Sequence, residues 1–199
     1  EQIARYVFTP GSHSRAKKIA DHLDDVELVS DSRGYMVYTG FTGGVRVTVS
    51  STGMGGPSTA ICLEELANMG ADTFIRVGSC GTYQEYVDCG DVIISTGTYR
   101  AGGTANNYLP IEFPAVPTFE ITKALVDAAK RLDHKAHVGL GSAGDAFYAP
   151  RRDPEMRKIL AQSGLVSAEM ESDTIFVLAA LRGWRAGALY ACDGTATET

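Results

Sequence analysis

The sequence has no excess of positive charge, no long apolar run and no internal repeat. Its 199 residues carry a net charge of −6 at pH 7, whereas general nucleic-acid binders are usually basic, so we expect no nucleic-acid partner. No apolar run approaches the roughly 20 residues of a membrane-spanning helix, and no signal peptide is recognisable, so we expect no membrane contact. The chain opens directly into a strand-like segment, and we expect its natural start to lie further upstream.

Cysteine is scarce, and its spacing excludes two classes of site. The four cysteines, Cys62, Cys80, Cys89 and Cys192, form no CxxC pair and no cluster with histidine. A zinc site or a disulfide framework is therefore not indicated. Cysteines at this density are typical of reduced thiols in a cytosolic protein, so we expect a cytoplasmic location and no bound metal.

The remaining composition, with 44% hydrophobic and 21% charged residues, is that of an ordinary globular protein. Alternating strand-like and helix-like patterns predict one α/β domain over residues 1–199. The pattern predicts a strand over Thr73–Val77 followed by a glycine-rich turn at Gly78–Gly81, a loop over Tyr99–Pro110, and a last strand over Arg185–Ala191.

The stretch from Ser51 to Gly81 contains a charged residue where an apolar one is expected. Arg76 lies in the otherwise apolar segment Thr73–Val77. A buried arginine is costly unless it meets an anion, so Arg76 either pairs with an internal carboxylate or binds an anionic ligand. The Gly-Ser-Cys-Gly turn expected after it, which includes Ser79, would let backbone amides approach the same ligand.

Four other segments place polar or aromatic groups at expected strand ends. Gly11, Ser12 and Arg15 fall where a strand turns into a helix, which is either an anion site or a plain capped turn. The carboxylates of Glu169 and Glu171 flank Met170 at another such junction, where they either cap amides or bind a ligand. The aromatic pair Phe147 and Tyr148 either packs in the core or stacks on a flat ring. Asp193 either forms an Asp-Gly turn or meets a ligand at the end of the last strand.

Four motifs, TGMGGPS, FIRVGSCG, EFPAV and EMES, resemble those of the nucleoside phosphorylase family, which includes uridine phosphorylases and hexameric purine nucleoside phosphorylases. The resemblance implies a mixed, partly barrel-like sheet surrounded by helices. It implies reversible phosphorolysis of a ribonucleoside to a free base and ribose 1-phosphate, with phosphate as a substrate and no cofactor. It also implies a homo-oligomer, at least a dimer. Family members end in a C-terminal helix that this sequence lacks, so we expect it to be missing or disordered.

The resemblance also assigns roles to individual residues. It implies that Arg33 reaches the phosphate of a neighbouring subunit, and that Arg76, Glu171 and Asp193 are the catalytic candidates. The family's PGDPxR loop is PGSHSR here, so His13 replaces a proline and is expected to be structural. The implied phosphate site is Gly11, Arg15, Arg33, Arg76 and Ser79; the ribose site is Glu169, Met170 and Glu171; the base site is Cys80, Gly81, Phe147, Tyr148, Arg151 and Arg152.

Two resemblances give different predictions for the base of the nucleoside. The motifs as a set are closer to uridine phosphorylases, although the glutamine that those enzymes carry after the aromatic pair is absent and only Arg151 or Arg152 could replace it. Asp193, in a Cys-Asp-Gly segment, resembles the acid of protozoan purine nucleoside phosphorylases. We favour uridine, with a purine nucleoside as the alternative. A nucleoside-binding module without turnover is the alternative of another class, and the retained arginines disfavour a hydrolase.

Overall fold

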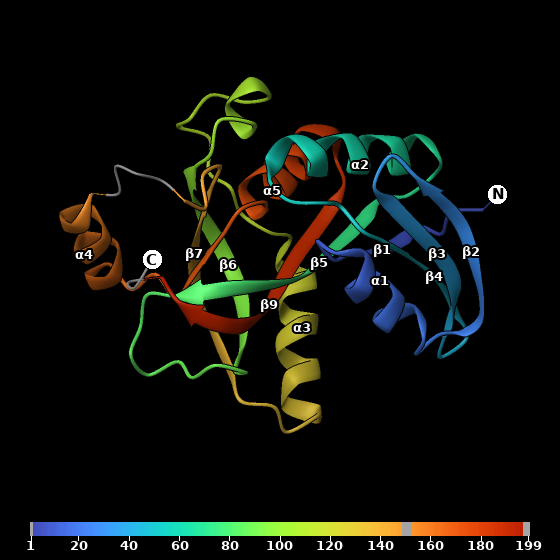
Figure 1. Ribbon diagram of the computed structural model, residues 1–199, viewed down its shortest axis with the longest axis horizontal. Helices are drawn as coiled ribbons and strands as arrows, with labels where there is room; N and C mark the ends of the chain where they lie inside the picture. Colours follow the sequence, from blue (N-terminus) through green and yellow to red (C-terminus); the bar gives the residue numbers. More distant parts are fainter. Residues whose placement is uncertain (1, 149–152, 197–199) are drawn as a thin grey trace.

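The computed structural model describes residues 2–148 and 153–196 as an α/β fold with one continuous mixed sheet (Figure 1). Five strands form a closed, barrel-like part, because β5 is paired with β8 at one side and β9 at the other, and the strands β7 and β6 complete the ring. This arrangement confirms the expected fold class. The five strands are β5 (Thr73–Thr82), β6 (Val92–Ala101), β7 (Ala136–Gly144), β8 (Ser167–Glu169) and β9 (Arg185–Thr195).

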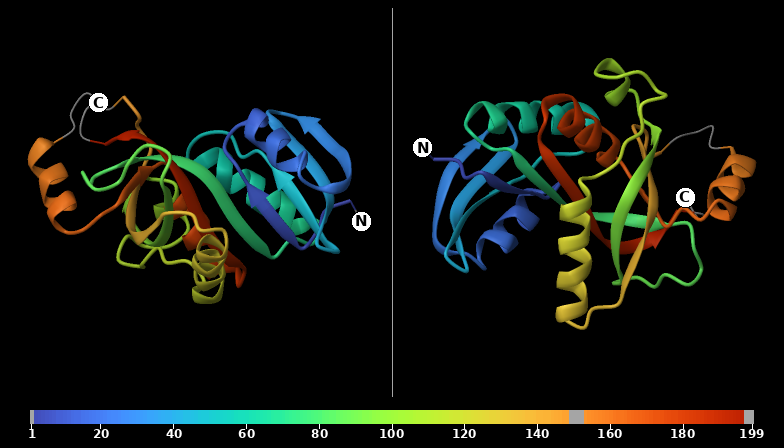
Figure 2. Two further views of the ribbon diagram at one scale, coloured as in Figure 1. Left: turned by 90° about the horizontal axis from the view of Figure 1, so that it is seen from below. Right: turned by 180° about the vertical axis from the view of Figure 1, so that it is seen from behind.

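Four further strands extend the sheet from β5. Strand β1 is parallel to both β5 and β4, and β2, β3 and β4 form an antiparallel meander. Figure 2 shows these strands on the side of the molecule opposite α4. Their bounds are β1 (Tyr6–Thr9), β2 (Asp24–Ser32), β3 (Tyr35–Thr42) and β4 (Val45–Ser50).

The helices pack on the sheet, and two of them, α2 and α5, also pack against each other. Helices α2 and α5 lie side by side (Figure 1), and α5 is buried over its first eight residues, among them Ile175 and Phe176. A buried apolar run of this kind packs on two faces and anchors the residues just before it. The helices are α1 (His13–Ala20), α2 (Gly56–Asn68), α3 (Phe119–Arg131), α4 (Pro154–Gln162) and α5 (Ser172–Arg182), with a short 3₁₀ turn, η1, at Ala105–Asn107.

The structure corrects the expected turn at Gly78–Gly81, which continues strand β5 to Thr82. Glycine is needed there for close packing, because a Cβ on Gly78 would lie 2.9 Å from Tyr190 Cδ1. The last strand is likewise longer than expected, so Asp193 and Gly194 belong to β9 and form no turn.

The expected loop at Tyr99–Pro110 is also partly wrong, because β6 includes Tyr99 and Arg100. The buried guanidinium of Arg100 donates hydrogen bonds to the carbonyl oxygens of Pro110 and Phe113, both at 2.6 Å. These bonds fold the following segment back onto the strand, a role that spacing along the sequence does not reveal. Within the described residues, no helix is long and apolar enough to cross a membrane.

Candidate active site

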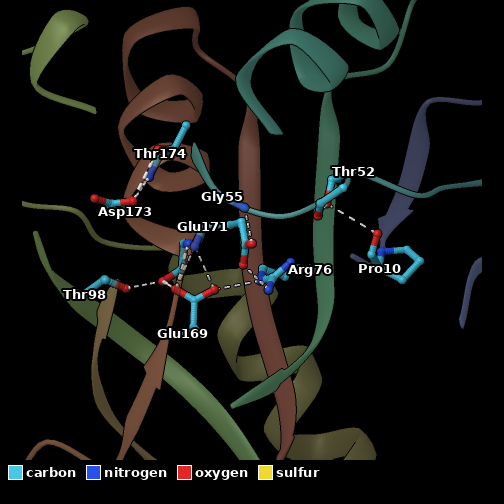
Figure 3. A network of polar contacts seen from close by, with 11 residues as sticks. Pro10, Thr52, Gly55, Arg76, Thr98, Glu169, Glu171, Asp173 and Thr174 are labelled. Carbon is cyan, nitrogen blue, oxygen red and sulfur yellow. Dashed lines mark hydrogen bonds and ion pairs between the residues drawn. The ribbon is translucent and has the colours of Figure 1, made fainter. Parts of the chain in front are cut away.

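Arg76 is the centre of a buried ionic network (Figure 3). Its side chain is only 5% exposed, and its Nε donates to Glu169 Oε2 at 2.8 Å. Its Nη2 pairs with Glu171 Oε2. Of the two interpretations that the sequence left open for Arg76, pairing with internal carboxylates is therefore present. The partners are the two glutamates that the sequence analysis assigned to ribose.

Glu169 fixes the start of α5 while it pairs with Arg76. Its carboxylate accepts hydrogen bonds from the backbone N–H groups of Glu171 and Ser172 and from Ser172 Oγ, at 2.7–3.1 Å. A carboxylate at a helix N-terminus also meets the favourable end of the helix dipole. Glu169 thus caps backbone amides, one of the two roles that the sequence left open for it. Both of its carboxylate oxygens accept hydrogen bonds.

Glu171 joins this network to the glycine-rich loop before α2. Its Oε1 accepts a hydrogen bond from the backbone N–H of Gly55 at 2.6 Å. Gly55 has a φ of +82°, a conformation that residues with a side chain rarely adopt. The glycine therefore aims its amide at the carboxylate, and two segments 116 residues apart meet at one side chain.

The network holds one positive and two negative side chains. Burial raises the pKa of Glu171 to about 7, opposed by Arg76 and reinforced by Glu169. Burial alone would lower the pKa of Arg76, but the two carboxylates outweigh it and raise that pKa. Arg76 Nη1 is buried and has no hydrogen-bond partner among the described residues. The arginine thus presents a free donor beside a carboxylate that titrates near neutrality.

Tyr190 packs against the other side of the arginine. Its ring centroid lies 6.0 Å from Arg76 Cζ, and the tyrosine is 2% exposed. A Cβ on Gly78 would come within 3.2 Å of Arg76 Cζ as well as 2.9 Å of Tyr190. Tyr190 and Gly78 therefore limit where the guanidinium can lie, and neither was identified as a site residue from the sequence.

A pocket of about 570 Å³ opens beside Glu169 and Met170. Its volume is within the range of small-molecule sites, which are mostly apolar with a few polar groups. It brings together predicted residues from four segments that are distant in the sequence. These are Gly81 on β5, Phe147 after β7, Glu169 at the end of β8 with Met170 directly after it, and Asp193 on β9.

The predicted phosphate loop lies against the same glycine-rich segment. The backbone N–H of Thr52 donates to the carbonyl of Pro10 at 2.9 Å, and a Cβ on Gly11 would lie 3.4 Å from Gly53 O. The Thr52–Gly55 segment therefore contacts the loop at Gly11 on one side and the Glu171 carboxylate on the other. Ser12 caps α1, because its Oγ accepts a hydrogen bond from the Arg15 N–H at 3.2 Å.

The other two predicted phosphate arginines form no hydrogen bond or ion pair with the buried network of the described residues. Arg15 is half-buried and Arg33 is exposed, and neither guanidinium has a hydrogen-bond or ionic partner within residues 2–148 and 153–196. Ser79 lies three residues after Arg76 in β5, so strand alternation directs its side chain to the opposite face.

The remaining base-site candidates differ in their surroundings. Cys80 is buried, and burial raises the pKa of its thiol, so it is a packing residue beside the pocket. Tyr148 is 89% exposed and stands edge-on to Phe147 with a centroid separation of 4.9 Å. Arg151 and Arg152 lie outside the described residues.

Asp173 is a further buried acid that the sequence analysis missed. It is 2% exposed, and burial raises its pKa to about 6. A Cβ on Gly102 would lie 3.0 Å from Asp173 Oδ2 and 2.9 Å from Asp145 Oδ1. Asp145 Oδ2 also accepts from the Gly103 N–H at 2.6 Å, so the two acids flank the loop that follows β6. Among the described residues, no group of three or more His, Cys, Asp or Glu side chains could hold a metal ion.

Comparison with known proteins agrees with this geometry. Residues 5–199 match the family model described as the phosphorylase superfamily. The chain belongs to this superfamily. The matched residues include every helix and strand that contributes to the buried network and the pocket.

Superfamily members similar to this chain include enzymes named for different bases. The uridine phosphorylase of Thermococcus kodakarensis is 40% identical over 95% of this chain and 72% of its own length. The guanosine phosphorylase of Halorubrum lacusprofundi is 40% identical over 93% of this chain and 76% of its own length. The uridine phosphorylase of Escherichia coli is 37% identical over 94% of this chain and 78% of its own length.

Proposed function

We propose that this protein is a nucleoside phosphorylase that splits uridine with phosphate to give uracil and ribose 1-phosphate, in the reversible manner expected from the sequence. The observation that carries the proposal is the free Nη1 donor of Arg76, held next to the Glu171 carboxylate in a buried network whose third member, Glu169, lines the pocket. The Arg76 donor suits an anion such as phosphate, and the Glu171 carboxylate suits the two hydroxyls of a ribose.

In the proposed reaction, a phosphate oxygen attacks C1′ of the ribose while the bond from C1′ to the base nitrogen breaks. The electron pair of that bond leaves with the base, which takes up a proton, while the attacking hydrogen phosphate gives up its own proton, so the protons balance. Phosphate is already anionic, so the protein need not activate a hydroxyl group. Its tasks are to hold the reactants in line and to stabilise the positive charge that develops on the sugar.

Glu171 suits the ribose because an ionised carboxylate accepts hydrogen bonds from two neighbouring hydroxyls. Its negative charge also favours an oxocarbenium-like sugar, as does a phosphate held by Arg76. Met170 and Phe147 line the pocket and supply apolar surface for the sugar and the base. Gly11 and Arg15 would complete the phosphate site from the adjoining loop, together with Arg33.

Two observations favour a purine nucleoside as the second candidate substrate. One similar relative is a guanosine phosphorylase, and Asp193 lines the pocket. A departing purine accepts a proton on its five-membered ring, which a carboxylic acid can donate. Uridine remains our choice because two of the three relatives described above are uridine phosphorylases.

Base release measured with and without phosphate tests the proposal. Uridine and guanosine should be assayed side by side, with ribose 1-phosphate quantified as product. We expect phosphate-dependent release of uracil. Release that is equal without phosphate would indicate a hydrolase, and tight binding without release would indicate a binding module. Guanosine turnover that far exceeds uridine turnover would identify the purine alternative.

We also propose that the enzyme works as a homo-oligomer of at least two chains, with Arg33 completing the phosphate site of a partner subunit. The exposure of Arg33 supports this arrangement. We propose a cytoplasmic location, which the four unpaired cysteines support, and a role in pyrimidine salvage, which follows from the proposed reaction.

A further inference from the structure

A hydrogen bond from α1 holds the turn that carries Arg33. His13 Nε2 lies 2.6 Å from the carbonyl oxygen of Gly34, 21 residues later in the chain. A carbonyl oxygen can only accept, so Nε2 carries the proton and donates. His13 is the residue that replaces the proline of the loop motif, and the contact gives it a defined partner.

The turn itself has an unfavourable residue at its tip. Strand β2 ends at Ser32 and β3 begins at Tyr35, so Arg33 and Gly34 form a two-residue hairpin loop. Their φ angles are +52° and +85°. Such loops strongly prefer Asn-Gly or Gly-Gly, because a longer side chain is disfavoured at positive φ. An exposed arginine kept in this conformation suggests a role for its charge at that place.

The donor side of the hydrogen bond belongs to the proposed phosphate loop. His13 is the first residue of α1, directly after the Ser12 cap. The helix N-terminus favours an anion, and Arg15 lies in the same first turn. The bond from His13 thus connects two phosphate-binding candidates, the loop Gly11–Arg15 and the turn of Arg33, within one chain.

We propose that His13 is a positioning residue for phosphate binding. Its hydrogen bond to Gly34 fixes the orientation of the Arg33 turn, and so sets the affinity for phosphate without a contact to phosphate. This inference rests on the proposed function. If Arg33 serves a partner subunit, the bond also connects the phosphate loop of one site with the arginine of the next.

Steady-state kinetics of single variants test the proposal. His13→Ala should raise the phosphate KM about 2- to 10-fold, the range expected for one hydrogen bond, and leave the nucleoside KM and the kcat at saturating phosphate unchanged. His13→Gln retains an N–H donor and should restore much of the phosphate affinity. His22→Ala is the matched control, because His22 is an exposed histidine beyond the other end of α1.

The double variant His13→Ala, Arg33→Ala decides whether His13 acts through Arg33. We expect no further rise in phosphate KM beyond that of Arg33→Ala alone. An unchanged phosphate KM in His13→Ala, or an equal loss in both backgrounds, would overturn the inference while the phosphorylase function stands. A wild-type enzyme without phosphate dependence would instead refute the proposed function and this inference together.

Discussion

Replacing Arg76 with alanine should damage the stability of the protein as well as its activity. The side chains of Arg76, Glu169 and Glu171 are only 5%, 2% and 4% exposed, so the substitution leaves two carboxylates facing each other without their shared cation. Removing one partner of a buried ion pair costs about 3–5 kcal/mol, because the remaining charge is uncompensated. We expect Arg76→Ala to lose stability in this range.

The same substitution should also weaken phosphate binding. A hydrogen bond to a charged group contributes about 1.5–3 kcal/mol, which corresponds to roughly one to two decades in phosphate affinity. Arg76→Lys is the matched variant for separating the two effects. It keeps a positive charge near the carboxylates, so it should retain more stability, but it lacks the planar fork and should still bind phosphate weakly.

Urea unfolding at one fixed protein concentration measures the stability change, because an oligomer's stability depends on concentration. Adding Glu171→Gln to Arg76→Ala removes the repulsion between the two carboxylates and should recover part of the loss. The reasoning fails if Arg76→Ala unfolds within about 1 kcal/mol of the wild type, since a buried network of this kind cannot lose its cation at so small a cost.

Five further predictions concern the same site. Glu171→Gln should discriminate ribosides from 2′-deoxyribosides less well than wild type in competition assays, and an unchanged ratio would remove Glu171 from the sugar site. Because burial raises the pKa of Glu171 from 4.5 to about 7, its contribution to stability is full below pH 4.5 and is lost as the pH rises through 7, so Glu171→Gln should flatten that fall in unfolding titrations. Asp193→Asn should lower guanosine turnover about 10²–10⁴-fold if Asp193 is the acid for a purine, and leave uridine turnover nearly unchanged; equal losses on both substrates would argue for a structural role. Gly78→Ala should displace the Arg76 guanidinium and raise the phosphate KM, whereas wild-type kinetics would show that the contact relaxes freely. Co-refolding equal amounts of Arg33→Ala and Arg76→Lys chains should restore about a quarter of wild-type activity if each site takes Arg33 from its partner, since half of the dimers are mixed and each has one intact site; no recovery would place Arg33 in its own chain's site.

The sequence predicted the fold class, but it placed the ends of two strands too early. Residues 78–81 contain two glycines and look like a turn, but Gly78 lies within β5 because Tyr190 leaves no space for a side chain. Similarly, Asp193 lies in β9, because strand pairing with β5 extends to Thr195. Local composition cannot distinguish a glycine that allows a turn from one that allows close packing, since the packing partner is more than a hundred residues away.

The partners of Arg76 illustrate the same limit at the site. The sequence indicated that a buried arginine requires an anion, and it separately indicated two carboxylates at the start of α5. It did not indicate that these are one network, because pairing between β5 and β8 brings them together. The network therefore adds a consequence for mutagenesis: removing Arg76 leaves two buried carboxylates without their cation, so it should cost stability as well as phosphate binding.

The charge of the network explains why the proposed phosphate site needs arginines from outside it. With both glutamates ionised, Glu169, Glu171 and Arg76 carry a net charge of −1, so Arg76 alone would bring phosphate next to an already negative cluster. Coulomb repulsion at such short range in a buried site costs several kcal/mol. Either Glu171 takes up a proton, for which a pKa of about 7 is suited, or further cations must approach. Arg15 and Arg33 are the cations that the loop and the turn can supply, and the hydrogen bond from His13 to Gly34 connects their two segments. Phosphate affinity should therefore depend on Arg15 and Arg33 at least as strongly as on the buried Arg76.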